Sequence, residues 1–192
     1  MNDNANSLDG MRVAVLLTDG FEEVEMVKPR EALQRAGARI ELVSPAQGKV
    51  QGWNHDEKGH TFPVDVPLDR ADPQEYDGLM LPGGVRNPDQ MRLIPKAVQF
   101  VRHFFEDAKP VAAICHAPWM LVEAGVVRGR HLTSWPSLQT DLRNAGADWE
   151  DDVVVRDDGL VTSRKPDDIP AFNEAMIHLF AMKRSRVQAG AR

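Results

Sequence analysis

Residues 110–119, PVAAICHAPW, contain an apolar run that enters the only cysteine of the chain and continues as a helical pattern. A short apolar run without a helical period predicts a buried strand. Pro118 suits the first turn of a helix, where its missing N–H is not needed. The stretch therefore predicts a strand, a turn at Cys115 and a helix, which is the arrangement of a nucleophile elbow.

Such a turn favours a reactive thiol at Cys115. It holds the side chain out of the sheet, and the free N–H groups of the new helix point toward the sulfur. Surroundings of this kind can lower the pKa of a thiol from about 8.5 to between about 3.5 and 7.5. The alternative is a buried, inert core cysteine, which behaves as a small apolar residue. The residues of this stretch alone leave both interpretations open.

The segments on either side of the elbow predict the rest of the sheet. Residues 12–17 and 39–44 are apolar runs separated by a helical pattern, which indicates a βαβ unit with parallel strands and a right-handed crossover. Residues 77–81 form a further strand, and residues 45–75 predict small extra strands and loops. We therefore predict an α/β protein, a three-layer α/β/α sandwich with a mostly parallel, flavodoxin-like sheet.

Later segments complete this prediction with alternating helices and strands. Residues 96–107 carry apolar side chains at three- and four-residue steps, which is typical of a helix with one buried face. We further expect a helix over 137–145, a hairpin pairing 152–156 with 160–163 around Asp157-Asp158-Gly159, and a last helix capped by Asp167 or Asp168.

Composition limits the classes of function. The chain has 192 residues, a formal net charge of −6 and one cysteine. Without a basic run or a long apolar segment, nothing indicates binding to nucleic acid or a membrane. One cysteine excludes an internal disulfide and is typical of a reducing compartment, so we expect a cytoplasmic protein. We expect a disordered tail over 1–10, a single domain over 11–183 and a polar C-terminal tail over 184–192.

Three predicted strand ends carry polar or flexible residues, and ligands bind beyond the carboxyl ends of parallel strands. Glu22, Glu23 and Glu25 follow the first strand, although carboxylates also favour a solvated first helical turn. Gly83 and Gly84 follow another strand; they either form an oxyanion hole or merely a tight turn. His116 follows Cys115, as a proton carrier or as an ordinary helix N-terminal residue. Trp119 and Trp135 are expected near the elbow.

Four segments, in order, carry a family resemblance: DGFEEVE, LPGGVRNPD, VAAICHAPW and VTSRKPDDIPAFN. Together they resemble the ThiJ/PfpI family of the class I glutamine amidotransferase-like superfamily. The resemblance spans roughly residues 11–182 and is most similar to the branch of PfpI-type intracellular proteases, general stress proteins and protein deglycases. An ordered set of motifs is far more specific than any one of them.

This resemblance implies a role for each matching residue. Cys115 corresponds to the nucleophile, His116 to the proposed base, and Glu25 to the glutamate that lies against the sulfur. Asp89 corresponds to the acidic residue that completes the PfpI-type triad from a neighbouring subunit, so a homodimer or higher homo-oligomer is implied. Gly84 and the backbone N–H of His116 would form the oxyanion hole.

Three departures from the family pattern bear on these roles. Ala117 stands where the family commonly has glycine, which adds a methyl group at the turn. Asp89 is shorter than the glutamate of some relatives, which puts its reach to His116 in doubt. Glutaminases of the superfamily use a His-x-Glu pair near the C-terminus, but here Leu179 and Phe180 follow His178. Glutamine hydrolysis is therefore not expected.

The resemblance favours a stress-protective cysteine hydrolase that acts on glyoxal- or methylglyoxal-modified amino groups or thiols, or on peptides. One alternative is an oxidative-stress sensor that works through oxidation of Cys115. Another is a holdase chaperone. No metal or other cofactor is expected, because the polar cluster His55, Asp56, Glu57 and His60 lacks a metal-ligand spacing and is interpreted as a solvated loop.

Overall fold

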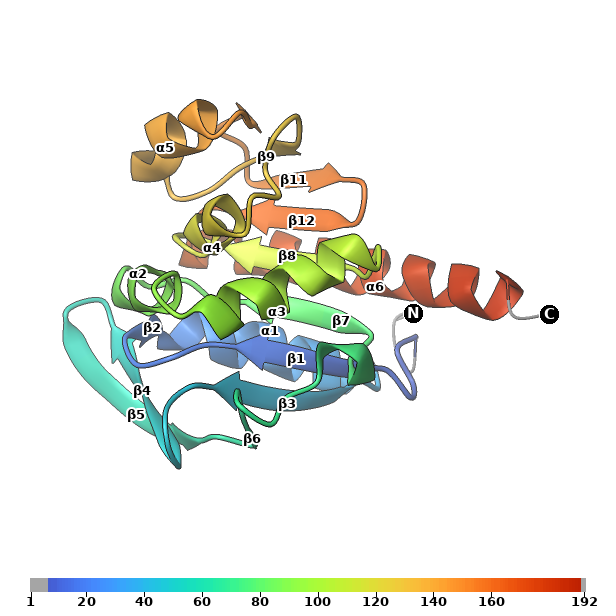
Figure 1. Ribbon diagram of the computed structural model, residues 1–192, viewed down its shortest axis with the longest axis horizontal. Helices are drawn as coiled ribbons and strands as arrows, with labels where there is room; N and C mark the ends of the chain where they lie inside the picture. The colour runs from blue at the N-terminus through green and yellow to red at the C-terminus, as the bar shows by residue number, and fades with distance from the viewer. Residues whose placement is uncertain (1–6, 191–192) are drawn as a thin grey trace.

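The computed structural model describes residues 7–190, which contain a seven-stranded central sheet (Figure 1). The strand order is β11-β12-β8-β7-β1-β3-β6, and every neighbouring pair is parallel except β11 and β12. The strands are β1 (Arg12–Leu16), β3 (Arg39–Ser44), β6 (Val66–Pro67), β7 (Gly78–Leu81), β8 (Val111–Ile114), β11 (Val154–Asp157) and β12 (Leu160–Ser163).

Helices cover both faces of this sheet, which confirms the predicted three-layer sandwich (Figure 1). One face carries α1 (Glu23–Arg35) and α6 (Ile169–Gly190). The other carries α2 (Arg86–Met91), α3 (Pro95–Glu106), α4 (Pro118–Glu123) and α5 (Gln139–Asn144). Short 3-10 turns are η1 (Pro73–Glu75), η2 (Pro136–Leu138) and η3 (Pro166–Asp168). Within the described residues, no helix combines the length and apolar character needed to cross a membrane.

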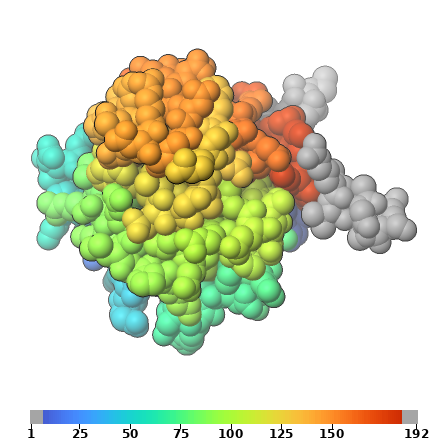
Figure 2. Space-filling model, turned by 45° about the horizontal axis from the view of Figure 1, so that its top comes forward, coloured from blue at the N-terminus to red at the C-terminus, as the bar shows by residue number. Residues whose placement is uncertain are grey.

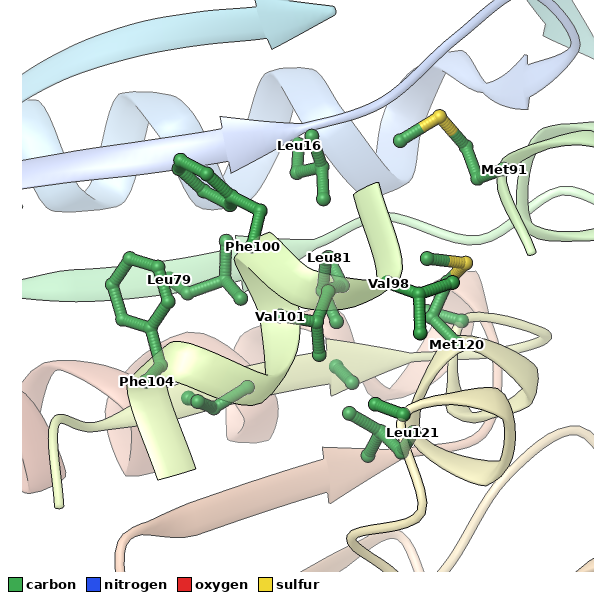
Figure 3. Close-up of a cluster of buried hydrophobic side chains, with 14 of the residues drawn as sticks. Leu16, Leu79, Leu81, Met91, Val98, Phe100, Val101, Phe104, Met120 and Leu121 are labelled. Carbon is green, nitrogen blue, oxygen red and sulfur yellow. The ribbon is translucent and has the colours of Figure 1, made fainter. Parts of the chain in front are cut away.

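Successive side chains of each strand point to opposite faces of the sheet and contribute to two buried hydrophobic clusters, one on each face. In β7, Leu79 and Leu81 lie in the cluster beneath α3, whereas Met80 lies in the cluster beneath α1 and α6. Figure 3 shows the first cluster, where Val101 and Phe104 of α3 lie over β7. The same alternation places Ile114, the last residue of β8, on the α1 and α6 face.

Two small sheets lie outside the main one. In the first, β4 (Lys49–Asn54) is the central strand. It pairs in parallel with β2 (Phe21–Glu22) and in antiparallel orientation with β5 (Glu57–Pro63). The β4–β5 hairpin, turquoise in Figure 2, projects at the edge of the molecule. The second small sheet pairs β9 (His131–Leu132) with β10 (Asp148–Trp149). The hairpin confirms small extra strands in the 45–75 segment.

The structure describes part of each predicted tail. Residues 1–6, part of the expected tail, lie outside the described residues, but Leu8 is fully buried and its N–H donates to Ala36 O at 2.8 Å. An apolar side chain that packs on α1 removes residues 7–10 from the tail. At the other end, α6 continues to Gly190, so most of the expected polar tail is helical. The polar composition of residues 184–190 did not indicate a helix, because the core-packing residues of α6 lie earlier, between Ile169 and Phe180.

Candidate active site

The elbow forms as the sequence predicts. β8 ends at Ile114, Cys115 adopts a φ of 65°, and α4 begins at Pro118. A left-handed conformation is strained for a residue with a Cβ, by about 1–2 kcal/mol. Hydrogen bonds hold the turn on both sides: Cys115 N–H donates to Ser163 O at 3.0 Å, and Cys115 O accepts from Trp135 N–H at 2.8 Å. The strained conformation is thus imposed by the two strands and the loop around it.

Cys115 faces a cavity of about 430 Å³ at the carboxyl ends of the strands. The thiol residue is only 6% exposed, so the cavity provides the route by which a small ligand reaches the sulfur. Segments far apart in the chain meet here, and Figure 1 shows their elements, β2, α2, α4 and the β4–β5 hairpin, gathered at one end of the sheet. The lining residues are Gly20, Glu22, Glu25, Trp53, His55, Asp56, Gly84, Val85, Arg86, Cys115, His116, Trp135 and Pro166.

The imidazole ring of His116 folds back toward the thiol of Cys115, which is uncommon for adjacent residues. Its Nδ1 is 3.2 Å from the Cys115 Sγ, and its ring stacks on Trp135 with centroids 5.7 Å apart. Trp119 packs against the ring at 5.4 Å, which confirms both tryptophans near the elbow. Burial lowers the pKa of His116 to about 4, because it penalises the imidazolium. The ring is therefore neutral at pH 7 and able to accept a proton.

Glu25 is completely buried against the elbow. Its Oε2 accepts from Gly83 N–H at 3.1 Å, and the carboxyl interacts with the Cys115 side chain. Burial raises the pKa of Glu25 to about 8, with a smaller contribution from the Glu22 charge, and these outweigh the hydrogen bonds that favour the carboxylate. Glu25 is therefore protonated at neutral pH and can donate a hydrogen bond.

The thiol and this carboxyl are electrostatically coupled. Burial, with an ionised Glu25 adding to it, raises the pKa of Cys115 well above its ordinary value, and the backbone N–H groups of Gly84 and His116, directed at the sulfur, offset this only in part. The pKa of the thiol is therefore not lowered, contrary to what the turn alone predicts, and Cys115 needs a base to take its proton. Because Glu25 is neutral below about pH 8, its negative charge does not oppose thiolate formation at neutral pH. A thiolate at Cys115 is therefore more stable beside a protonated Glu25 than beside an ionised one.

The glycines of the β7–α2 loop allow its backbone to approach the sulfur. A Cβ on Gly83 would lie 2.5 Å from Glu25 Oε2 and 2.6 Å from Cys115 Cβ. Gly84 has a φ of +77°, and a Cβ there would lie 2.5 Å from Gly20 O. No larger residue fits either position without displacing the loop.

Asn87 holds this loop and was missed in the sequence. It is buried; its side-chain oxygen accepts from Thr18 N–H at 2.8 Å, and its Nδ2 donates to Pro82 O and Gly83 O at 2.9 and 3.2 Å. The amide thereby ties the end of β1 to the glycines. An asparagine three residues after a Gly-Gly pair was the available signal, but only the fold shows that it is buried.

Asp89 does not reach the site within one chain. It is an exposed residue of α2 and does not line the cavity. His116 Nε2, for its part, has no hydrogen-bond partner among residues 7–190. The structure therefore brings together Cys115, His116, Glu25 and Gly84 and leaves Asp89 on the surface.

The β4–β5 hairpin supplies a wall of the cavity that sequence reasoning did not assign. Trp53, His55 and Asp56 line it, and Glu22 Oε2 accepts from His55 N–H at 3.1 Å. Glu22 and Glu23 are therefore anchors of the hairpin rather than merely solvated residues of a first turn. Among the described residues, no group of three or more His, Cys, Asp or Glu side chains is placed to hold a metal ion.

Comparisons with known proteins identify the family of this chain. The DJ-1/PfpI family signature matches residues 11–179. The chain belongs to the DJ-1/PfpI family. It is 42% identical over 169 residues to a deglycase of Thermococcus kodakarensis, covering 88% of this chain and 99% of that protein. Protein/nucleic acid deglycase 2 of Escherichia coli is also 42% identical over 169 residues, covering 88% of this chain and 96% of the relative.

A solved member of the family has the same fold. DJ-1beta from Drosophila melanogaster superposes with a TM-score of 0.80 at 29% identity, covering 94% of this chain and 97% of that one. Membership confirms the predicted ThiJ/PfpI resemblance. The elbow, the buried glutamate and the glycine loop thus lie within a DJ-1/PfpI domain.

Proposed function

We propose that this DJ-1/PfpI protein is a stress-protective, cysteine-dependent hydrolase of glyoxal- and methylglyoxal-modified amino groups or thiols. The observation that carries the proposal is the surroundings of the Cys115 sulfur. It lies 3.2 Å from a neutral imidazole, faces two backbone N–H groups and adjoins a protonated carboxyl inside a small cavity. The relatives named as deglycases support the choice of substrate class.

The proposed reaction needs only water as co-reactant. Cys115 Sγ attacks a carbonyl carbon of the adduct, and the electron pair of the C=O bond moves to its oxygen. The N–H groups of Gly84 and His116 stabilise that oxyanion, while His116 accepts and returns the proton.

In a methylglyoxal adduct, the carbonyl that Cys115 attacks arises when one hydrogen moves from the carbinol carbon to the neighbouring ketone carbon, so that the first carbon is oxidised to the acid level and the second is reduced to an alcohol. When the oxyanion collapses, the C–N or C–S bond of the adduct breaks, the amine or thiol leaves with the proton that His116 carried, and water cleaves the remaining Cys115 thioester. Adduct and water therefore yield the free amine or thiol and a hydroxy acid.

Glu25 fits this scheme as a hydrogen-bond donor rather than as a base. A carboxyl with a pKa near 8 keeps its proton at neutral pH and can donate it in a hydrogen bond to the thiolate. A base at this position would instead place a second negative charge beside the sulfur. The division of roles follows from environment: the buried imidazole accepts protons, and the buried carboxyl retains one.

We further propose that the working unit is a homo-oligomer in which Asp89 of one subunit completes the site of another. Asp89 is exposed on α2, the helix that directly follows the cavity-lining Val85, and His116 Nε2 lacks a partner within the part of its chain that the structure describes. A carboxylate on that nitrogen would orient the ring and stabilise the imidazolium. A reactive thiol without a resolving cysteine would work in a reducing compartment, so we place the protein in the cytoplasm.

The test compares wild type with Cys115→Ala on methylglyoxal adducts of N-acetylcysteine and N-acetyllysine. Free aldehyde is measured in parallel, because its consumption pulls the adduct equilibrium backward and imitates deglycation. We expect catalytic loss of adduct, faster than the spontaneous release of aldehyde, in wild type only. Adduct loss that merely follows aldehyde consumption would replace the proposal with aldehyde detoxification. Equal activity in Cys115→Ala would remove the cysteine mechanism altogether.

A further inference from the structure

We propose that Arg86 is a specificity-determining residue that binds a carboxylate of the substrate while Cys115 attacks the adduct. Arg86 and Cys115 line the same cavity. The Arg86 guanidinium lies over the Trp53 ring, 4.3 Å from its centroid. This inference rests on the proposed function and narrows it to adducts of carboxylate-bearing molecules, such as free amino acids, rather than neutral ones.

Stacking on Trp53 leaves the binding edge of Arg86 available. A guanidinium uses its flat face against an aromatic ring, while its N–H donors point outward in the plane. Those donors match the two oxygens of a carboxylate in a bidentate pair. Among the described residues, Arg86 forms no ion pair or side-chain hydrogen bond. Arg86 is an exposed residue at the cavity, and its guanidinium is stacked on Trp53 without an ion-pair partner among the described residues.

Backbone and hairpin contacts fix this position. Arg86 is the first residue of α2, and a Cβ on Gly20 would lie 2.5 Å from the Arg86 Cβ, so the arginine packs closely against the loop after β1. Trp53 belongs to β4, whose Gly52 pairs with Phe21 of β2. The two stacked side chains thus come from elements that meet at the rim of the site. A preorganised side chain loses less entropy when it binds a ligand.

Two other charged side chains line the cavity, Glu22 and Asp56. Glu22 Oε2 accepts from His55 N–H, and Asp56 lies exposed in the β4–β5 turn. Neither forms an ion pair with Arg86, so neither neutralises it. Glu25 is uncharged at neutral pH. Arg86 is therefore the cavity-lining group suited to bind an anionic part of the substrate.

The experiment uses a matched pair of thiols, N-acetylcysteine and its neutral amide, each as the methylglyoxal adduct. Wild type, Arg86→Gln, Arg86→Lys and the control Arg70→Gln, which removes one charge from an exposed site outside the cavity, are compared. We expect wild type to prefer the acid by about tenfold in kcat/KM, mainly through KM. Arg86→Gln should lose the preference for the acid over the amide, Arg86→Lys should retain part of it, and Arg70→Gln should match wild type.

Binding measured apart from turnover separates this inference from the proposed function. Calorimetric titration of Cys115→Ala and of Cys115→Ala/Arg86→Gln with N-acetylcysteine and its amide needs no catalysis. Tighter binding of the acid that depends on Arg86 supports the inference even if wild type turns over neither adduct, a result that would refute only the hydrolase. Equal affinity for acid and amide in Cys115→Ala, or an acid preference that survives Arg86→Gln, would overturn it.

Discussion

At the scale of single residues, the site depends on where protons reside. Burial raises the pKa of Glu25 and lowers the pKa of His116, because it disfavours the charged form of each side chain. Glu25 consequently keeps its proton up to about pH 8, and His116 remains neutral down to about pH 4. Both groups are therefore in the forms that the proposed chemistry requires across the physiological range.

Ionisation of the buried Glu25 should lower the free energy of unfolding as pH rises. Its pKa is about 8 in the folded protein against an ordinary 4.5, so its favourable contribution is complete below about pH 4.5 and is lost as pH rises through 8. Glu25→Gln, which mimics the protonated carboxyl, should remove that decline, on the order of a few kcal/mol. Urea unfolding at pH 5.5 and 8.5 measures it, with half-exposed Glu31→Gln on α1 as control. Parallel pH profiles for wild type and Glu25→Gln would contradict the buried, protonated state.

His116 should stay neutral between pH 5 and 7. Its pKa is about 4 because Trp135 and Trp119 exclude water from the ring, and Trp135→Ala should raise that value toward 6.5. The chemical shift of the His116 Cε1–H across the titration reports this directly. An imidazole in wild type that titrates near 6.5 would show that the ring is hydrated.

The strand, turn and helix around Cys115 could be predicted from sequence, because they lie in one short motif. Cys115 and His116 follow a buried strand directly, but the 3.2 Å approach of the His116 ring to the thiol was not expected of adjacent residues. Arg86 and Trp53 could not be paired this way, because they are 33 positions apart and meet only where α2 and the hairpin reach one cavity. The contact of Asn87 with Thr18, which follows β1, could not be predicted for the same reason, because the two residues are 69 positions apart.

At the scale of elements, the β4–β5 hairpin is attached to the start of α1 by two carboxylates. Glu22 accepts from His55 N–H, and Glu23 accepts from His60 N–H at 2.6 Å while its Oε1 lies 2.7 Å from His60 Nδ1. These contacts lower the pKa of Glu23, which indicates that they stabilise its ionised form. The wall of the cavity therefore depends on residues that precede Glu25 by two or three positions.

Glu23→Gln should loosen that wall without unfolding the domain. The variant weakens both contacts to His60, so amide hydrogen exchange in residues 55–62 should speed up by about tenfold while β1 and β8 remain protected. Hydrogen-exchange mass spectrometry measures the difference, and Glu57→Gln, at the exposed first residue of β5, is the control. Unchanged exchange in the hairpin would mean that strand pairing alone holds it.

Strands and helices with regular periodicity were predicted from sequence, whereas tertiary contacts of polar segments were not. The apolar runs of β1, β3, β7 and β8 and the buried face of α3 depend on local pattern. The short helix α2, which begins at Arg86, has no such periodicity, and its buried Asn87 is held by contacts that only the fold creates. Leu8 likewise packs under α1 from a segment whose composition resembles a tail.

At the scale of the whole molecule, a shared active site predicts complementation between two inactive variants. Cys115→Ala lacks the nucleophile but keeps Asp89, and Asp89→Asn keeps the nucleophile but should lose about 10- to 100-fold in kcat. Mixing the two through unfolding and refolding should yield hetero-oligomers with restored sites.

The recovered activity should reach a substantial fraction of wild type and disappear upon dilution to monomers. Refolding each variant alone provides the control. If the mixture shows only the sum of the two separate activities, Asp89 does not act across subunits. Full activity in Asp89→Asn alone would remove Asp89 from the mechanism.

The central claim is that Cys115 forms a covalent bond to the adduct during turnover. Rapid acid quenching during hydrolysis of a methylglyoxal adduct, followed by peptide mass spectrometry, tests it most directly. We predict a transient mass increase on the peptide that contains Cys115, rising and decaying at the rate of turnover and absent from Cys115→Ala. Continued turnover with an unmodified Cys115 throughout would contradict the account.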